Sequence, residues 1–397
     1  MEFGVLKLDY FLGLTSYRLK SHFSMLKSNI YSYLSKVKKK TSHITALHEK
    51  DGVEQPATTS KSAAQKIQNQ RKNSPTPSQL ATGIFKGDRT ALSRGITLIE
   101  STAKKHEGPA KELIGLCLSE TKPSIRIGIT GVPGVGKSTF IESLGSLITQ
   151  QEKKVAVLAV DPSSSISKGS ILGDKTRMEA LVKNPRAFIR PSASGTSLGG
   201  VARKTREAII LCEAAGYDTI IIETVGVGQS ETAVHSMTDF FLLLKLAGAG
   251  DELQGIKRGI IEMADAIVIN KADGENVKAA KLAKTEFNRA LHLYPEKESG
   301  WSPKTFTCSA IKNEGIDTLW EHIEAYHETV MESGCFQTKR NEQNKFWLLQ
   351  TIEDQLKRNF YSNEAVKKAL EAQLTLLKTN KTTPFEAAEI LLKHYEL

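Results

Sequence analysis

The chain has 397 residues, of which 40% are hydrophobic and 25% are charged, as is ordinary for a globular protein. This length allows one large α/β domain with extensions. Its four cysteines occur singly, with no C-x-x-C pair and no histidine cluster beside them, so we expect neither a disulfide framework nor a zinc site. They are Cys117, Cys212, Cys308 and Cys335. No apolar window reaches 18 residues, so we expect no membrane span.

Much of the net charge of +10 comes from residues 1–50, where lysines and one arginine far outnumber Glu2, Asp9 and Glu49. Basic segments bind nucleic acid, bind membranes or direct targeting. This one is rich in Ser, Tyr, Leu and Lys and can form a basic amphipathic helix, so it resembles a mitochondrial transit peptide. Scarce arginine and the early acids leave a disordered cytosolic tail as the alternative. We expect import into the mitochondrial matrix and no nucleic-acid partner.

Composition then divides the chain into regions. Residues 51–77 are polar and contain Pro56, Pro75 and Pro77, which predicts a linker and assigns 1–77 to targeting segment and linker. Residues 78–122 carry apolar side chains at helical spacing, among them Leu92, Ile96 and Ile99, which predicts a helical extension of the next domain.

The main domain is expected over residues 123–332, where short apolar strands alternate with helices. Several strands are near-continuous apolar runs, typical of a parallel sheet that is covered on both faces. The pattern predicts a doubly wound, mostly parallel α/β fold, which binds nucleotides at the carboxyl ends of its strands. The expected strands are 125–130, 155–160, 187–190, 219–223, 240–246, 266–270 and 304–308.

A glycine-rich loop follows the first of these strands and precedes a helix. It fits G-x-x-x-x-G-K-[ST], and that context is the one a P-loop requires. Glycines let backbone N–H groups turn around a phosphate, and the helix N-terminus adds partial positive charge. Lys137 is expected to reach the β- and γ-phosphates, and the Ser138 hydroxyl to join the Mg²⁺ shell. The loop comprises Gly131, Val132, Pro133, Gly134, Val135, Gly136, Lys137, Ser138 and Thr139.

The base is expected to be chosen by a second motif, Asn270-Lys271-Ala272-Asp273, which directly follows the strand at 266–270. Asp273 can accept hydrogen bonds from the ring N–H and the amino group of guanine, whereas adenine would leave the carboxylate unpaired. Asn270 can brace the loop, and Lys271 can lie along the base. After the last strand, the turn of Ser309, Ala310 and Ile311 can bring backbone N–H groups to guanine O6.

Carboxylates at two further strand ends are candidate Mg²⁺ ligands, because this ion prefers hard oxygen donors. They are Asp161 and Glu223, with Asp174 as a third candidate. Ser/Gly-rich loops near these positions are typical of segments that order around a γ-phosphate. Gln229, Asp251 and Lys257 in two of them could position water or relay the nucleotide state; plain surface loops are the alternative reading.

Residues 339–397 are helical by pattern, with three apolar stripes. The simplest reading is helices packed on their own domain. A dimerisation arm is the alternative, because the stripes follow the last core strand and need a partner.

Taken together, these motifs resemble the MeaB/methylmalonic aciduria type A family of SIMIBI-class, ArgK-like P-loop GTPases, from about residue 80 to the C-terminus. The resemblance implies a homodimeric GTPase chaperone of methylmalonyl-CoA mutase that gates adenosylcobalamin delivery and helps to replace damaged cofactor. It also implies phosphate binding by Gly131–Thr139 and guanine binding by Asp273 with Ser309–Ile311. It further implies that Ser138, Asp161, Asp174 and Glu223 serve Mg²⁺ binding and switching, and that Lys257 lies in the loop that couples the nucleotide state to the mutase.

Three other functions remain open. A nickel-insertion GTPase would carry Cys or His ligands near the switches, where this chain has only the lone Cys212 and His235. A kinase would pass phosphate to a transporter protein. A nucleotide-stabilised scaffold would bind GTP without turnover.

Overall fold

The computed structural model describes residues 75–160, 178–191, 198–224, 231–248 and 258–396, and the side chains of 198–200, 258 and 396 are left out of the description. All of these residues fall within one compact unit, residues 74–397. In the part of the chain so described, no helix is both long and apolar enough to cross a membrane.

A parallel sheet forms the centre of this unit, with strand order β3-β2-β4-β1-β5-β6-β7, and every pairing in it is parallel. The predicted strands are confirmed to within one residue at each end. They are β1 (Ile125–Gly131), β2 (Val155–Val160), β3 (Ala187–Arg190), β4 (Thr219–Thr224), β5 (Phe240–Leu246), β6 (Ala266–Asn270) and β7 (Lys304–Thr307).

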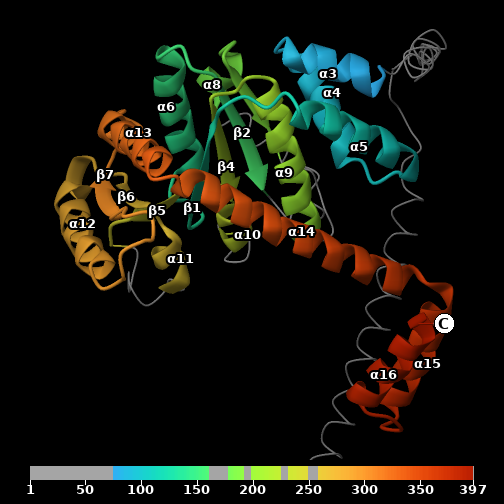
Figure 1. Ribbon diagram of the computed structural model, residues 1–397. Coiled ribbons are helices and arrows are strands. Elements are labelled where there is room, and N and C mark those ends of the chain that lie inside the picture. Colours follow the sequence, from blue (N-terminus) through green and yellow to red (C-terminus); the bar gives the residue numbers. More distant parts are fainter. Residues whose placement is uncertain (1–74, 161–177, 192–197, 225–230, 249–257, 397) are drawn as a thin grey trace, which may run out of the picture. The chain divides into compact units, whose positions relative to one another are not determined.

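One face of the sheet is covered by α6 (Lys137–Gln150), α8 (Glu179–Lys183) and α13 (Ile316–Glu332). The opposite face carries α9 (Leu198–Ala214), α10 (Glu231–His235), α11 (Arg258–Met263) and α12 (Val277–Leu291), the last preceded by the 3₁₀ turn η1 (Gly274–Asn276). Both faces are therefore apolar, and this explains why the strands read as continuous hydrophobic runs. Figure 1 shows these helices on the two sides of the sheet.

The helical extension packs on the outside of α9. It consists of α3 (Pro77–Phe85), α4 (Arg89–Glu100) and α5 (Lys104–Leu118). Asp88 begins α4 as its N-cap by accepting from the Thr90 amide, which satisfies one of the free donors at a helix start. Ile84, Ile96 and Leu113, one from each helix, are fully buried, so this segment shares the core of the sheet's α9 face.

The C-terminal segment forms α14 (Cys335–Ser362), α15 (Glu364–Lys378) and α16 (Pro384–Glu396). We predicted that the C-terminal helices pack on their own domain. For most of the apolar stripe of α14 this prediction is wrong. Trp347 is 6% exposed, but Phe346, Leu349, Ile352 and Leu356 are between 46% and 54% exposed. Amphipathic spacing fixes which side of a helix is apolar and leaves open what covers it.

The first turns of α14 are held by polar contacts to the amino edge of the sheet. Arg340 donates to the Asp239 carboxylate at 2.7 Å, Gln343 to the Thr238 carbonyl and Trp347 to the Ser236 carbonyl. These three positions, one turn apart, lie on one side of the helix. The start of α14 is therefore bound to the segment that leads into β5.

Candidate functional site

The P-loop connects β1 to α6 at the carboxyl edge of the sheet, and glycine is required in it for two different reasons. Gly136 has φ of +93°, a region that side chains with a Cβ rarely enter. At Gly131 a Cβ would lie 2.6 Å from the Leu244 carbonyl oxygen, so no larger residue fits between β1 and β5. Val132, Pro133 and Gly134 are exposed along the loop, whereas Val135 is buried beneath it.

Lys137, the first residue of α6, lies over this loop. Its side chain is part of a residue only 8% exposed, and its Nζ donates to the carbonyls of Gly131 at 2.8 Å and Val132 at 3.3 Å. Burial lowers the pKa of the Lys137 ammonium, and the nearby carboxylates Glu223 and Glu231 oppose that shift. A buried cation at a helix N-terminus suits the binding of an anion such as a phosphate.

Ser138 and Glu223 meet beside Lys137. The Ser138 hydroxyl donates to the Glu223 carboxylate at 3.4 Å, and Glu223, near the end of β4, is 8% exposed. A hydroxyl and a carboxylate at this separation form a hard-oxygen donor pair, which fits the preference of Mg²⁺. The other predicted ligands and switch residues, Asp161, Asp174 and Lys257, together with Gln229 and Asp251, lie outside the described residues.

The guanine motif contacts the P-loop directly. Asn270, the last residue of β6, donates its Nδ2 to the Val135 carbonyl at 2.9 Å, and Lys271 donates its Nζ to the Gly134 carbonyl at 2.9 Å. The structure thus brings Asn270 to the loop that it was expected to brace. Lys271 reaches the same loop from a left-handed backbone conformation, φ +57°.

Asp273 and the 309–311 turn come together at the far side of the same edge. The Ser309 hydroxyl donates to the Asp273 carboxylate, and the Ala310 amide donates to the Asn270 Oδ1 at 3.3 Å. The side chain of Ile311 projects outward, since this residue is 77% exposed. The two predicted guanine-binding segments are therefore joined through their own side chains.

Two further contacts in this region have no counterpart in any of the motifs. Ser143 on α6 donates to the Ala310 carbonyl at 2.6 Å, which ties the P-loop helix to the guanine turn. The Thr224 hydroxyl donates to the Thr130 hydroxyl at 2.9 Å, which joins the carboxyl ends of β4 and β1. For Ser143 the sequence offers only a polar residue between the apolar positions of a helix, and for the threonines only their places at the strand ends.

Known proteins resemble this chain over most of its length. Residues 92–365 match the family described as methylmalonyl Co-A mutase-associated GTPase MeaB. A probable GTPase of Mycobacterium tuberculosis is 47% identical over 314 residues, which cover 79% of this chain and 94% of that protein. The mitochondrial methylmalonic aciduria type A homolog of Mus musculus is 43% identical over 328 residues, 80% of this chain and 79% of the relative.

A solved structure agrees with these sequences. The crystal structure of an LAO/AO transport system kinase superposes with a TM-score of 0.65 at 35% identity, over 82% of this chain and 99% of that one. Sequence identity above 40% to these two relatives, together with the fold shared with the solved structure, shows common ancestry. The chain belongs to the MeaB family of P-loop GTPases.

Proposed function

We propose that this GTP hydrolase is a GTP-dependent chaperone of methylmalonyl-CoA mutase that gates adenosylcobalamin delivery and protects or reactivates that enzyme. The observation that supports GTP as the nucleotide is the junction of Asp273 with Ser309 on the same sheet edge as Lys137 and Ser138. The mutase as partner rests on the family description, which speaks of mutase-associated GTPases, and on relatives such as the mouse protein.

In this proposal each side chain at the carboxyl edge has a defined task. The P-loop amides of Gly131–Thr139 bind the phosphates, and Lys137 exchanges its carbonyl partners for β- and γ-phosphate oxygens. Ser138 and Glu223 would hold Mg²⁺, with Asp161 and Asp174 as further candidate ligands. When bound, that ion neutralises charge that develops on the phosphates.

The base is held by the second half of the edge. The Asp273 carboxylate accepts from the guanine N1–H and from its amino group, an arrangement that adenine cannot satisfy. The amides of Ser309 and Ala310 donate within the protein, to the Glu314 carbonyl and to Asn270. We therefore assign guanine O6 to the backbone N–H of Ile311. Lys257 remains our candidate for relaying the nucleotide state to the mutase.

The exposed stripe on α14 supports a homodimer. Four large apolar side chains between 46% and 54% exposed on one helix call for a protein partner, and a second copy of the chain supplies an identical stripe. We place the protein in the mitochondrial matrix, on the basic composition of residues 1–50 and the mitochondrial relatives.

Phosphate release with and without purified mutase tests the central proposal. The chain is incubated with Mg²⁺ and GTP, alone, with methylmalonyl-CoA mutase, and with bovine serum albumin as a control. We expect GTP turnover to rise only with the mutase, and adenosylcobalamin loading of the mutase to depend on the nucleotide added. A mutase that leaves both turnover and cofactor loading unchanged would contradict the chaperone role.

The same assay separates the alternative functions. Tight nickel binding by calorimetry would favour a metal-insertion GTPase, although the described residues contain no cluster of three or more metal-ligating side chains. Radiolabelled phosphate attached stably to a partner protein would favour a kinase. Release of no phosphate under any condition would favour a nucleotide-dependent scaffold.

A further inference from the structure

A cavity of about 890 Å³ lies at the amino edge of the sheet, the edge opposite the P-loop. Asp239 and Asp265, which directly precede β5 and β6, form part of its wall. The remaining wall comes from α10, α11, the 291–303 segment, α13 and the start of α14. A volume of this size is in the range of pockets that enclose a small organic ligand or a few residues of a peptide.

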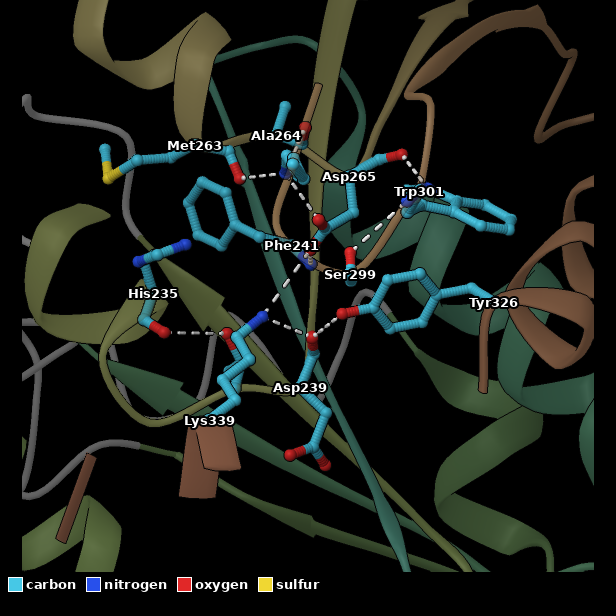
Figure 2. A network of polar contacts seen from close by, with 12 residues as sticks. His235, Asp239, Phe241, Met263, Ala264, Asp265, Ser299, Trp301, Tyr326 and Lys339 are labelled. Atoms are coloured by element: carbon cyan, nitrogen blue, oxygen red, sulfur yellow. Dashed lines mark hydrogen bonds and ion pairs between the residues drawn. The ribbon is translucent and has the colours of Figure 1, made fainter. Parts of the chain in front are cut away.

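Aromatic rings form much of the cavity wall. Trp301 and Tyr326 meet edge to face, with ring centroids 5.0 Å apart. The Tyr326 hydroxyl donates to the Asp239 carbonyl, and the Trp301 Nε1 donates to the Asp265 carbonyl. Figure 2 shows both rings with their polar atoms turned to the backbone. Because these polar atoms are already bonded, the two side chains offer a ligand mainly apolar surface.

The basic side chains of the wall are bound to the protein itself. Lys297 donates to the Asp265 carboxylate at 2.5 Å and to the Ala264 carbonyl at 2.9 Å. Lys339 donates to the Asp239 carbonyl at 2.6 Å and lies 3.9 Å from the second Asp265 oxygen. Burial tends to raise the pKa of the Asp265 carboxyl, but Lys339 and Lys297 hold it below its usual value. An anionic ligand would have to break these contacts.

The rim of the cavity is acidic. It carries four exposed glutamates from three separate segments, and within the described parts of the chain none of them makes an ion pair or accepts a side-chain hydrogen bond. They are Glu262, Glu296, Glu298 and Glu342. Like charges around a concave, apolar surface concentrate a negative potential inside it. Such a potential attracts cations and repels phosphates and carboxylates.

We propose that this cavity is a second ligand site, which binds an organic cation carried on an apolar body. The apolar part would be buried against Trp301, Tyr326 and Met263, where removal of its methylene groups from water favours binding. The cationic part, an alkylammonium or guanidinium group, would lie among the rim glutamates. A free small molecule and a lysine or arginine side chain beside an apolar residue of a peptide share this chemistry.

Calorimetric titration of the full chain with three defined probes tests the site. Hexylguanidinium represents the free cation, N-acetyl-leucyl-arginine amide the peptide-borne cation, and N-acetyl-leucyl-glutamate amide the matched anion. Both cationic probes should bind and the anionic one should not. Tighter binding of the dipeptide indicates a peptide as the natural source, and tighter binding of hexylguanidinium indicates a small molecule.

Rim variants assign the binding to this cavity. The double substitution Glu298→Gln and Glu342→Gln should lower the affinity for the cationic probes about tenfold, because two negative charges near the ligand are lost. The control is Glu353→Gln with Glu371→Gln, two exposed glutamates of α14 and α15, which should change nothing. Equal binding of cationic and anionic probes, or equal effects of the two double changes, would overturn the proposal.

The site is independent of GTP binding, and the Lys137→Ala variant separates the two. This variant should still bind the cationic probes with unchanged affinity, whatever happens to its GTP turnover. If none of the probes binds to the wild-type chain at any protein concentration, the cavity is not a cation site, even where GTPase activity is intact.

Discussion

At the carboxyl edge of the sheet, the cations Lys137 and Lys271 donate to backbone carbonyls of the P-loop. At the amino edge, Arg340 and Lys297 donate to the buried carboxylates of Asp239 and Asp265. A carbonyl is a weaker partner for a cation than a carboxylate, and a lysine held by carbonyls can exchange them for phosphate oxygens. The cations at the carboxyl edge can therefore exchange their partners, whereas those at the amino edge form lasting ion pairs.

The two edges also differ in how the chain assembles them. The carboxyl edge draws on short contiguous motifs that follow strand ends, because the carboxyl ends of parallel strands meet at one edge. The amino edge draws on Asp239, Asp265, Lys297 and Arg340, which are scattered along the chain. Substitutions at the amino edge should therefore lower the stability of the fold, and substitutions at the carboxyl edge should impair the binding or hydrolysis of GTP.

The largest effect is expected at Arg340. Its guanidinium donates to the Asp239 carboxylate at 2.7 Å and to the Ser124 carbonyl at 2.9 Å. Arg340→Met leaves the Asp239 carboxylate, itself 1% exposed, with its main cationic partner removed. The free energy of unfolding should fall by about 3–5 kcal/mol, measured by urea denaturation. Lys345→Met, at an exposed position of the same helix, is the control, and equal midpoints for the two variants would break the comparison.

Lys137→Ala tests the opposite edge. This change removes the cation that we expect to bind the β- and γ-phosphates, and GTP turnover should fall about 10²- to 10³-fold, as for loss of one preorganised charge-stabilising donor. The midpoint of urea denaturation should fall less than in Arg340→Met, since the Lys137 Nζ donates to two carbonyls of the P-loop.

Lys183→Ala is the matched control for this change, because Lys183 is exposed on α8. Unchanged turnover in Lys137→Ala would remove the P-loop lysine from the mechanism. A loss of stability as large as that of Arg340→Met would instead show that both edges are structural.

Asp273→Asn should alter the choice of base. The loss of the charge-assisted hydrogen bond that we propose between Asp273 and guanine should cost about 1.5–3 kcal/mol, so the preference for GTP over other purine triphosphates should fall about 10- to 100-fold in competition binding. Glu275→Gln, an exposed change two residues along in η1, should leave the preference intact. A GTP preference that survives Asp273→Asn would assign recognition of the base to another group.

These two edges show why sequence predicts some features and misses others. The strands were predictable because a parallel sheet buried on both faces makes each strand a short apolar run. The positions of the P-loop and of Asn270–Asp273 at the ends of β1 and β6 were predictable because each of these motifs is contiguous. Ser143 was not, since its partner, the Ala310 carbonyl, is 167 residues away in the sequence, and the two meet where α6 packs beside α13.

The same reasoning applies to the C-terminal helices and the cavity. The helical spacing of apolar residues predicted α14. The solvent exposure of these residues could not be predicted, because the spacing says nothing about what packs against them. The cavity depends on five separate segments of the chain. Its acidic and aromatic residues are dispersed over residues 232–342, so no short stretch of the sequence predicts the cavity.

Two partly buried histidines should contribute to the pH dependence of stability: His235, in the wall of this cavity, and His322 on α13, which packs against Trp301. Burial lowers the pKa of His235 to about 4, with a further lowering by Lys339, and burial lowers that of His322 to about 4. Their folded-state pKa values lie below the ordinary value of 6.5, so the unfolded chain takes up protons first as the pH falls. Stability is complete above pH 6.5 and declines towards pH 4, by up to about 1.4 kcal/mol per pH unit for each histidine.

His322→Phe tests that dependence, because its ring lies between Trp301 and Phe306 at centroid distances of 4.6 and 4.7 Å and phenylalanine can keep this stacking. The slope of unfolding free energy against pH between 6.5 and 5 should become smaller. His292→Gln, at an exposed position, should leave the slope as it is. A slope that is identical in His322→Phe and wild type would remove this histidine from the acid response.

The smallest effect is expected at Ser143, where the two halves of the GTP site are joined. Its hydroxyl donates to the Ala310 carbonyl, and loss of one such bond costs about 1 kcal/mol. If that bond holds the 309–311 turn against α6, Ser143→Ala should weaken the binding of GTP and of GDP about fivefold in equal measure, because we expect the turn to contact the base that both nucleotides share. Ser146→Ala, one turn along α6, is the matched control. A loss of stability without any loss of affinity would mean that Ser143 serves the packing of α6 and that other contacts, among them those to Asn270 and Asp273, position the 309–311 turn.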